Sequence, residues 1–161
     1  MKSVGMKSLA MAAGAVLALT GVGAWAQDTI ATGGATGSPS WGAFARDSQR
    51  IYLIDTANMV RDGDTVRATI ARVRRNAEAG DYSHVVDVFE IQCDGRQSRM
   101  ISSMDVEADG ETGDAYEEAE PWAPIRAGAF DSQVREMTCG DFVPAGASFP
   151  TIKAFIDAGR P

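Results

Sequence analysis

Hydrophobic and polar residues alternate in several short runs, which predict an antiparallel sheet. In the range 65–74, Val66, Ala68 and Ile70 alternate with polar neighbours, and a period of two is typical of a half-buried strand. Asp-Gly pairs at 62–63, 94–95 and 109–110 favour tight hairpin turns, and a loop over 77–82 contains Gly80 and Asp81. Further runs of this kind cover residues 84–93 and 97–107, and the meander then continues towards Tyr116. Residues 49–55 are also predicted to form a strand, because Ile51, Tyr52, Leu53 and Ile54 make a short apolar run.

The phase of the alternation changes inside the range 65–74. Beyond Ile70, the apolar positions shift to Ala71 and Val73. A β-bulge, which inserts one extra residue into a strand, would explain this shift. A sheet with both faces partly covered would explain it equally, and the sequence leaves both explanations open.

Helical periodicity appears only near the C-terminus. Phe130, Val134 and Met137 recur at i, i+4 and i+7 and are followed by Cys139 and Gly140. This spacing predicts a short helix that ends at the cysteine.

A second helix is predicted from Ser148 onward. Ser148 is a typical N-cap, and Pro150 stands in the first turn, where proline is tolerated. Ile152 and Ile156 lie on one side, and Gly159 stands just past the expected end. The predicted fold class is therefore α+β: a small antiparallel β-meander with one or two C-terminal helices packed on it and one disulfide.

The first 26 residues have the composition of a cleavable export signal. Two lysines precede an apolar run over 9–19, and no acidic residue is present. The run is shorter than the roughly 20 residues that cross a bilayer. We therefore expect cleavage between Ala26 and Gln27, no transmembrane segment afterwards, and a periplasmic or secreted product.

A change of composition at residue 41 sets the expected domain boundaries. Glycine, serine and threonine dominate before this point, and apolar residues return after it. The expected parts are a signal peptide at 1–26, a flexible leader at 27–40, an α+β domain at 41–143 and an amphipathic helix at 144–161.

The chain is acidic, with a net charge of −7 that becomes −9 once the signal and its two lysines are removed. This balance excludes nucleic acid as a natural partner and disfavours an anionic membrane.

Cys93 and Cys139 are the only cysteines, so an exported chain of this size is expected to join them in one disulfide. The chain-entropy model gives a loop of this length about 4 kcal/mol of stabilisation. The alternative, a pair of thiols or a nucleophilic cysteine, lacks a neighbouring base, because His84 is the only imidazole.

Four carboxylates form the sharpest chemical motif, and they match positions one, three, five and seven of a calcium-binding loop. They are Asp105, Glu107, Asp109 and Glu111. The twelfth position requires a bidentate carboxylate, and Tyr116 occupies it. A solvated acidic turn is the favoured interpretation, and no metal or cofactor is expected.

Charge is segregated along the chain. Residues 105–120 carry eight carboxylates and no basic residue, whereas 61–75 carry five arginines and two aspartates. A binding face for an acidic protein or polysaccharide is one explanation. Solvent-facing strand positions with weak cross-strand pairing are the other. The arginines of the candidate face are Arg67, Arg72, Arg74 and Arg75.

No catalytic constellation is present. Ser83 and His84 are adjacent, and adjacent strand residues point to opposite faces, so they cannot act together as nucleophile and base. Glycine-rich phosphate loops between a strand and a helix are also missing. The sequence predicts a non-enzymatic protein.

The order and spacing of several anchors resemble one family. These anchors are Trp41, Tyr52-Leu53-Ile54-Asp55, the turn at 61–63, Cys93, Arg99, Trp122-Ala123-Pro124-Ile125, Gly128 and Cys139. The pattern resembles the surface-adhesin protein E-like domains of Gram-negative bacteria. The resemblance implies an antiparallel sheet carrying a helix, a disulfide that links the two, and exposure to the envelope or cell exterior. The chain departs from the family's pattern in lacking a lipoprotein cysteine and a proline within 126–128.

The expected function is binding of a protein or polymer partner, in the envelope or outside the cell, through the sheet or an edge strand, with a homodimer as a further expectation. Two alternatives remain. One is a secreted hydrolase or calcium-binding protein that uses the acidic segment 105–120, and the other is a structural envelope protein.

Overall fold

The computed structural model describes residues 37–161. The expected signal peptide and its cleavage point between Ala26 and Gln27 lie outside the described residues, as does most of the expected leader. These three expectations stay predictions.

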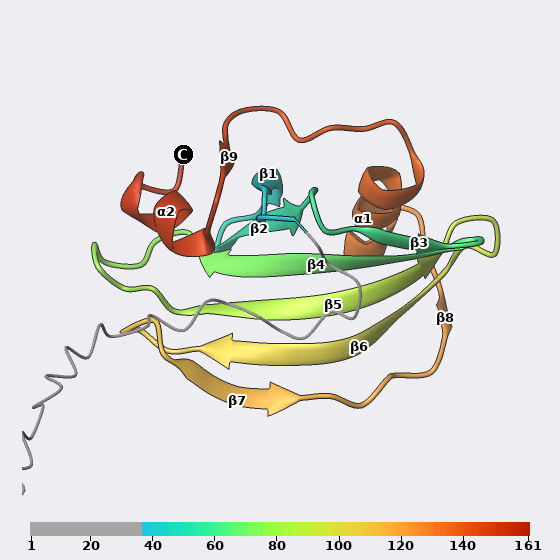
Figure 1. Cartoon of the computed structure of the whole chain (residues 1–161), viewed down its shortest axis with the longest axis horizontal. Helices are drawn as coiled ribbons and strands as arrows, with labels where there is room; N and C mark the ends of the chain where they lie inside the picture. Colours follow the sequence, from blue (N-terminus) through green and yellow to red (C-terminus); the bar gives the residue numbers. More distant parts are fainter. Residues whose placement is uncertain (1–36) are drawn as a thin grey trace, which may run out of the picture.

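The described part of the chain forms one antiparallel sheet and two short helices, so the α+β prediction is confirmed (Figure 1). The strands are β1 Trp41–Arg46, β2 Arg50–Asp55, β3 Val60–Asp62, β4 Thr65–Arg74, β5 His84–Gln92, β6 Gln97–Val106, β7 Thr112–Tyr116, β8 Ala123–Pro124 and β9 Ser148–Phe149. The helices are α1 Phe130–Cys139 and α2 Ile152–Asp157. The main path of the sheet runs β7-β6-β5-β4-β2-β1-β9, with β3 paired to β4 and β8 to β6.

Strand β4 pairs with β5, β2 and β3 without a register shift. Its register with β5 runs from Thr65 opposite Gln92 to Val73 opposite His84, and its pairing with β2 is equally regular. The bulge explanation for the change of phase is therefore wrong. Ile70 and Ala71 point to opposite faces and both are fully buried, because the sheet is covered on both sides.

Two hydrophobic clusters account for this double cover, one on each face. The cluster with α2 contains Trp41, Ile51, Leu53, Ala71, Val73, Val86, Ile152, Phe155 and Ile156. The cluster with α1 contains Ile54, Ala68, Ile70, Ile91, Ile125, Val134 and Met137. The helices lie towards opposite ends of β4 (Figure 1), so each end of the central strands has its own core.

The C-terminal helix begins later than the sequence predicts. Thr151 is its N-cap, with the side-chain oxygen accepting a hydrogen bond of 3.0 Å from the amide of Ala154. Ser148 is not the cap, because Ser148 and Phe149 form β9 and extend the sheet beside β1. Gly159 has φ of +85° and stands just past the helix end, as predicted.

Candidate functional site

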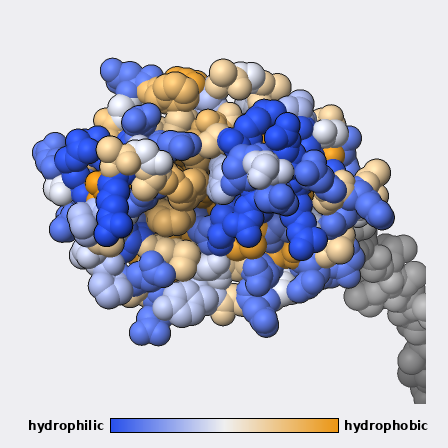
Figure 2. Space-filling view, turned by 180° about the vertical axis from the view of Figure 1, so that it is seen from behind, coloured by the Kyte–Doolittle hydropathy of each residue, from blue (hydrophilic) through white to orange (hydrophobic). Residues whose placement is uncertain are grey.

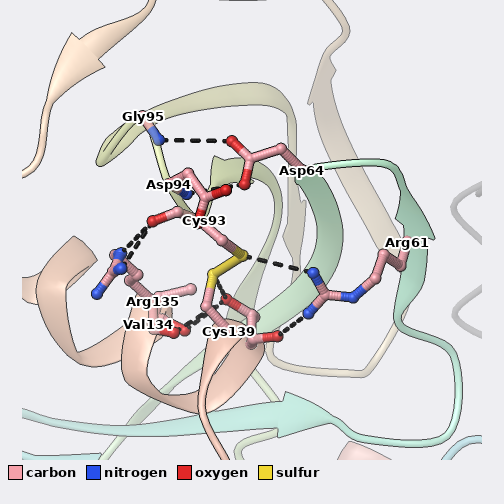
Figure 3. Close-up of a disulfide and its surroundings, with 9 residues drawn as sticks. Arg61, Asp64, Cys93, Asp94, Gly95, Val134, Arg135 and Cys139 are labelled. Atoms are coloured by element: carbon pink, nitrogen blue, oxygen red, sulfur yellow. Dashed lines mark hydrogen bonds between the residues drawn. A yellow bond between two sulfur atoms is a disulfide. The ribbon is translucent and has the colours of Figure 1, made fainter.

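The disulfide fastens α1 to the turn that follows β5 (Figure 3). Cys93 and Cys139 are bonded with a Cα–Cα distance of 5.5 Å, which confirms the predicted pairing. Arg135 donates two hydrogen bonds, of 3.0 and 2.7 Å, to the carbonyl of Cys93. Arg61 donates one of 3.0 Å to the carbonyl of Thr138. The cysteines thus belong to a structural joint in which neither sulfur is free to act as a nucleophile.

The four arginines of the candidate binding face do not share one surface. Arg67 and Arg72 are five residues apart on a regular strand, so they lie on opposite faces of the sheet. Arg74 lies on the face of Arg72. Arg75 follows the strand and donates a hydrogen bond of 3.3 Å to the carbonyl of Asp47.

Arg67 belongs to a charge cluster on one face of the sheet. It donates a 2.8 Å hydrogen bond to one oxygen of Glu90, while Arg99 binds the other oxygen at 2.6 Å. The guanidinium of Arg99 also lies 4.4 Å from the ring centre of Trp122. Burial alone would raise the pKa of Glu90, but the hydrogen bonds from Arg67 and Arg99 outweigh it and lower the pKa. This carboxylate is therefore ionised at neutral pH.

Arg72 belongs to a second charge cluster, on the other face. Asp87 is 1% exposed, and its carboxylate accepts hydrogen bonds from Arg72 at 2.9 Å and from Ser103 at 2.7 Å. Arg72 Nε lies 2.6 Å from the second oxygen of the same carboxylate. A buried carboxylate is tolerated when it is paired and hydrogen-bonded in this way. Both clusters neutralise arginines that the sequence alone presents as free charges.

Asp87 and Glu90 were missed by the reasoning from sequence, although a signal for them exists. Both stand inside the predicted strand over 84–93, where a charged residue on a covered face needs a partner. Once a hairpin register is assumed, Arg67 stands directly opposite Glu90. The register of β4 with β5 therefore identifies the partner of the charged residue.

Strand β7 forms an acidic edge of the sheet. It pairs with β6 on one side, and within residues 37–161 no strand pairs with its other side. Tyr116 at its end is 44% exposed, and the surrounding segment 105–120 carries eight carboxylates. This edge presents backbone hydrogen-bonding groups and negative charge to solvent.

The four residues of the calcium motif belong to this acidic edge. They are Asp105, Glu107, Asp109 and Glu111. Throughout the described range, no three His, Cys, Asp or Glu side chains gather closely enough to hold a metal ion. Asp109 instead accepts a hydrogen bond of 3.0 Å from the amide of Glu111, and Gly110 adopts φ of +89°. These contacts form a local turn.

His84 is buried at the start of β5. Its Nδ1 lies 2.7 Å from the carbonyl of Tyr82. Ser83 directly precedes this strand, and its amide donates a hydrogen bond of 2.9 Å to the carboxylate of Asp81.

Hydrophobic and hydrophilic side chains form distinct regions on the surface. Figure 2 shows a band of hydrophobic side chains between hydrophilic regions. The rings of Tyr52 and Phe130 are tilted against each other with centres 4.8 Å apart, and Phe44 and Phe89 also pack against the cluster of α1. Across residues 37–161, no helix is long and apolar enough to span a membrane.

Comparison with known proteins gives one match. The family model described as surface-adhesin protein E matches residues 41–140, which cover the sheet from β1 to β8 together with α1 and both cysteines. Strand β9 and helix α2 lie beyond the matched range. No curated protein and no solved structure matches the chain.

Proposed function

Since the chain belongs to the surface-adhesin protein E family, we propose that its domain is a non-enzymatic module that binds an external macromolecule along the edge strand β7. Membership of this family indicates an adhesin-like protein that is exposed on the cell surface or secreted. In this proposal the partner protein contributes a basic extended segment, which docks along β7.

The one-sided pairing of β7 carries this proposal. An exposed edge strand can accept an extended peptide as an additional strand through backbone hydrogen bonds. The eight carboxylates of 105–120 favour a basic partner, because complementary charge selects the partner and speeds the encounter. A second copy of the chain is a poorer occupant of this edge, because it would bring the same eight negative charges.

A synthetic eight-residue peptide of alternating lysine and valine tests the proposal. We expect it to bind the intact domain, with chemical shift changes centred on β7 in NMR spectra. The triple variant Asp114→Lys/Glu117→Lys/Glu118→Lys should weaken binding at least tenfold. The matched control Glu78→Lys/Glu136→Lys/Asp141→Lys reverses three exposed charges elsewhere and should change the affinity less than twofold.

The same peptide with methyl groups on every backbone nitrogen, which removes the N–H donors of both edges, separates strand addition from charge attraction. Strand addition predicts that methylation abolishes binding, since the methylated peptide cannot donate hydrogen bonds to the edge. Equal binding by the methylated peptide, or by the edge variant, would refute a β7 docking mode.

A further inference from the structure

A polar cavity open to solvent lies where β2 begins and β4 ends. Its volume is about 550 Å³, within the range of small-molecule sites. The lining contains one apolar residue, the small Ala77. Its residues are Asp47, Gln49, Arg50, Arg74, Asn76 and Ala77.

Two arginines lie side by side in the lining of this cavity. Arg50 and Arg74 are directly opposite in the pairing of β2 with β4, and like charges at such a position destabilise a sheet. Both are exposed, and among the ion pairs of residues 37–161 neither appears. Arg67 and Arg72 on the same sheet are each paired with a carboxylate. The charges of Asp47 and Asp81 offset those of Arg50 and Arg74 in part. Neither guanidinium is held in an ion pair within residues 37–161, so both remain able to contact an anionic group.

The carboxylate of Asp47 lines the cavity but is occupied by its own loop. It accepts hydrogen bonds of 2.7 Å from the amides of Gln49 and Arg50, and one of 2.8 Å from the hydroxyl of Tyr52. The hydrogen bonds from Gln49, Tyr52 and Arg50, in that order of importance, lower the pKa of Asp47. Asp47 thus fixes the loop that carries Arg50.

We propose that this cavity binds an acidic oligosaccharide, with a sulfate or carboxylate group held between Arg50 and Arg74. The planar fork of arginine matches the paired oxygens of such groups. The side-chain amides of Gln49 and Asn76 donate and accept hydrogen bonds, which suits sugar hydroxyls. The cavity is larger than one oxyanion, and its polar lining disfavours an apolar ligand. This site lies outside the β7 edge and takes a ligand of opposite charge, so it goes beyond the function proposed above.

An acidic peptide is the competing ligand. A peptide of aspartates and glutamates would bring a charge at every residue to a chain whose own net charge is −7. A sugar unit with one acidic group concentrates its charge at the arginines and leaves neutral hydroxyls elsewhere. The observations therefore favour the saccharide.

Calorimetric titration of the intact domain with a hyaluronan tetrasaccharide, which carries one carboxylate for every two sugar units and neutral hydroxyls elsewhere, tests the proposal. We expect binding that Arg50→Gln/Arg74→Gln weakens at least tenfold. The control Arg96→Gln/Arg126→Gln removes two exposed positive charges at other places and should change the affinity less than twofold. Maltotetraose, a neutral sugar of equal length, should not bind detectably. Circular dichroism should show that both double variants fold.

Three results would overturn the proposal. One is absence of tetrasaccharide binding by the intact domain. Another is an equal loss of affinity in the control variant, which would indicate attraction by total charge alone. The third is a hexapeptide of alternating aspartate and glutamate that binds as tightly as the tetrasaccharide and is equally sensitive to Arg50→Gln/Arg74→Gln. That result would assign the cavity to acidic peptides.

Discussion

Helices α1 and α2 cover opposite faces of one sheet and are held there by different means. Helix α1 has ten residues and no side-chain N-cap, and it is anchored by the disulfide and by hydrogen bonds from Arg61 and Arg135. Helix α2 has six residues, a side-chain cap from Thr151 and no covalent tie, and its side chain of Phe155 is completely buried.

The comparison of α1 with α2 shows two ways in which a small domain stabilises a short helix. A six-residue helix is unstable alone, so its packed face must supply most of its stability. Three of its six residues, Ile152, Phe155 and Ile156, enter the core. Helix α1 contributes Val134 and Met137 to its cluster and relies on the covalent joint in addition. One end of the domain thus depends on packing and the other on cross-linking.

Replacing Phe155 by alanine should have the largest effect, because it removes the centre of the α2 cluster. The ring is 0% exposed and packs edge-on against Phe149 with centres 5.4 Å apart. We expect a loss of about 3–5 kcal/mol in the free energy of unfolding, measured by denaturation in urea. Val143→Ala, at a side chain 76% exposed, should change this free energy by less than about 0.5 kcal/mol. Equal effects of the two variants would contradict a packing role for α2.

Reducing the disulfide should affect the opposite end of the molecule. Opening the link between Cys93 and Cys139, 46 residues apart, should cost about 2–4 kcal/mol. Amide hydrogen exchange should accelerate in α1 more than in α2. The double variant Cys93→Ala/Cys139→Ala controls for side reactions of the reducing agent. Equal acceleration in both helices would show that the two clusters unfold as one unit.

The charge cluster of Glu90 offers a pH-dependent test that involves neither helix. Its pKa is lowered from the ordinary value of 4.5, so its contribution to stability is present above that value and is lost as the pH falls through the lower folded-state pKa. Glu90→Gln should lower stability by about 1–2 kcal/mol at pH 7. The difference from wild type should shrink below pH 4.5. Glu118→Gln, at an exposed site, should show no such trend.

The smallest effect is expected at the cap of α2. Thr151→Ala removes the hydrogen bond to the amide of Ala154 and should cost about 1 kcal/mol. Thr151→Ser keeps a capping oxygen and should restore most of the loss. If alanine and serine destabilise the domain equally in thermal melting, the cap contributes nothing and burial alone holds the helix.

The sequence predicts the parts of this fold that depend on local patterns. Alternating or short apolar runs identified five strands, the spacing of Val134 and Met137 identified α1, and the cysteine count identified the disulfide. Strand β1 was not predicted, because its pairing with β2 is irregular between Ala43 and Ala45, and this interrupts the alternation. Ser148 was assigned to a helix cap, since its actual role depends on a partner strand more than 100 residues earlier.

The candidate sites depend on pairings that the sequence does not reveal. Strand β2 pairs with β4, although β3 lies between them in the sequence. Only this pairing sets Arg50 opposite Arg74. The acidic segment 105–120 was recognised from its composition, but its place at an edge follows from the order of strands. Composition identified the charges, and topology decided which of them are neutralised.

The pairing of β1 with β9 has a consequence for the order of synthesis. Trp41, at the start of the sheet, lies opposite Phe149, and Gly42 lies so close to Pro144 that an added Cβ would come within 2.7 Å of its ring. During synthesis, β1 is therefore made long before β9, its outer neighbour in the sheet. Contacts so distant in sequence form slowly. The domain can complete its sheet only after Ser148 and Phe149 have been synthesised.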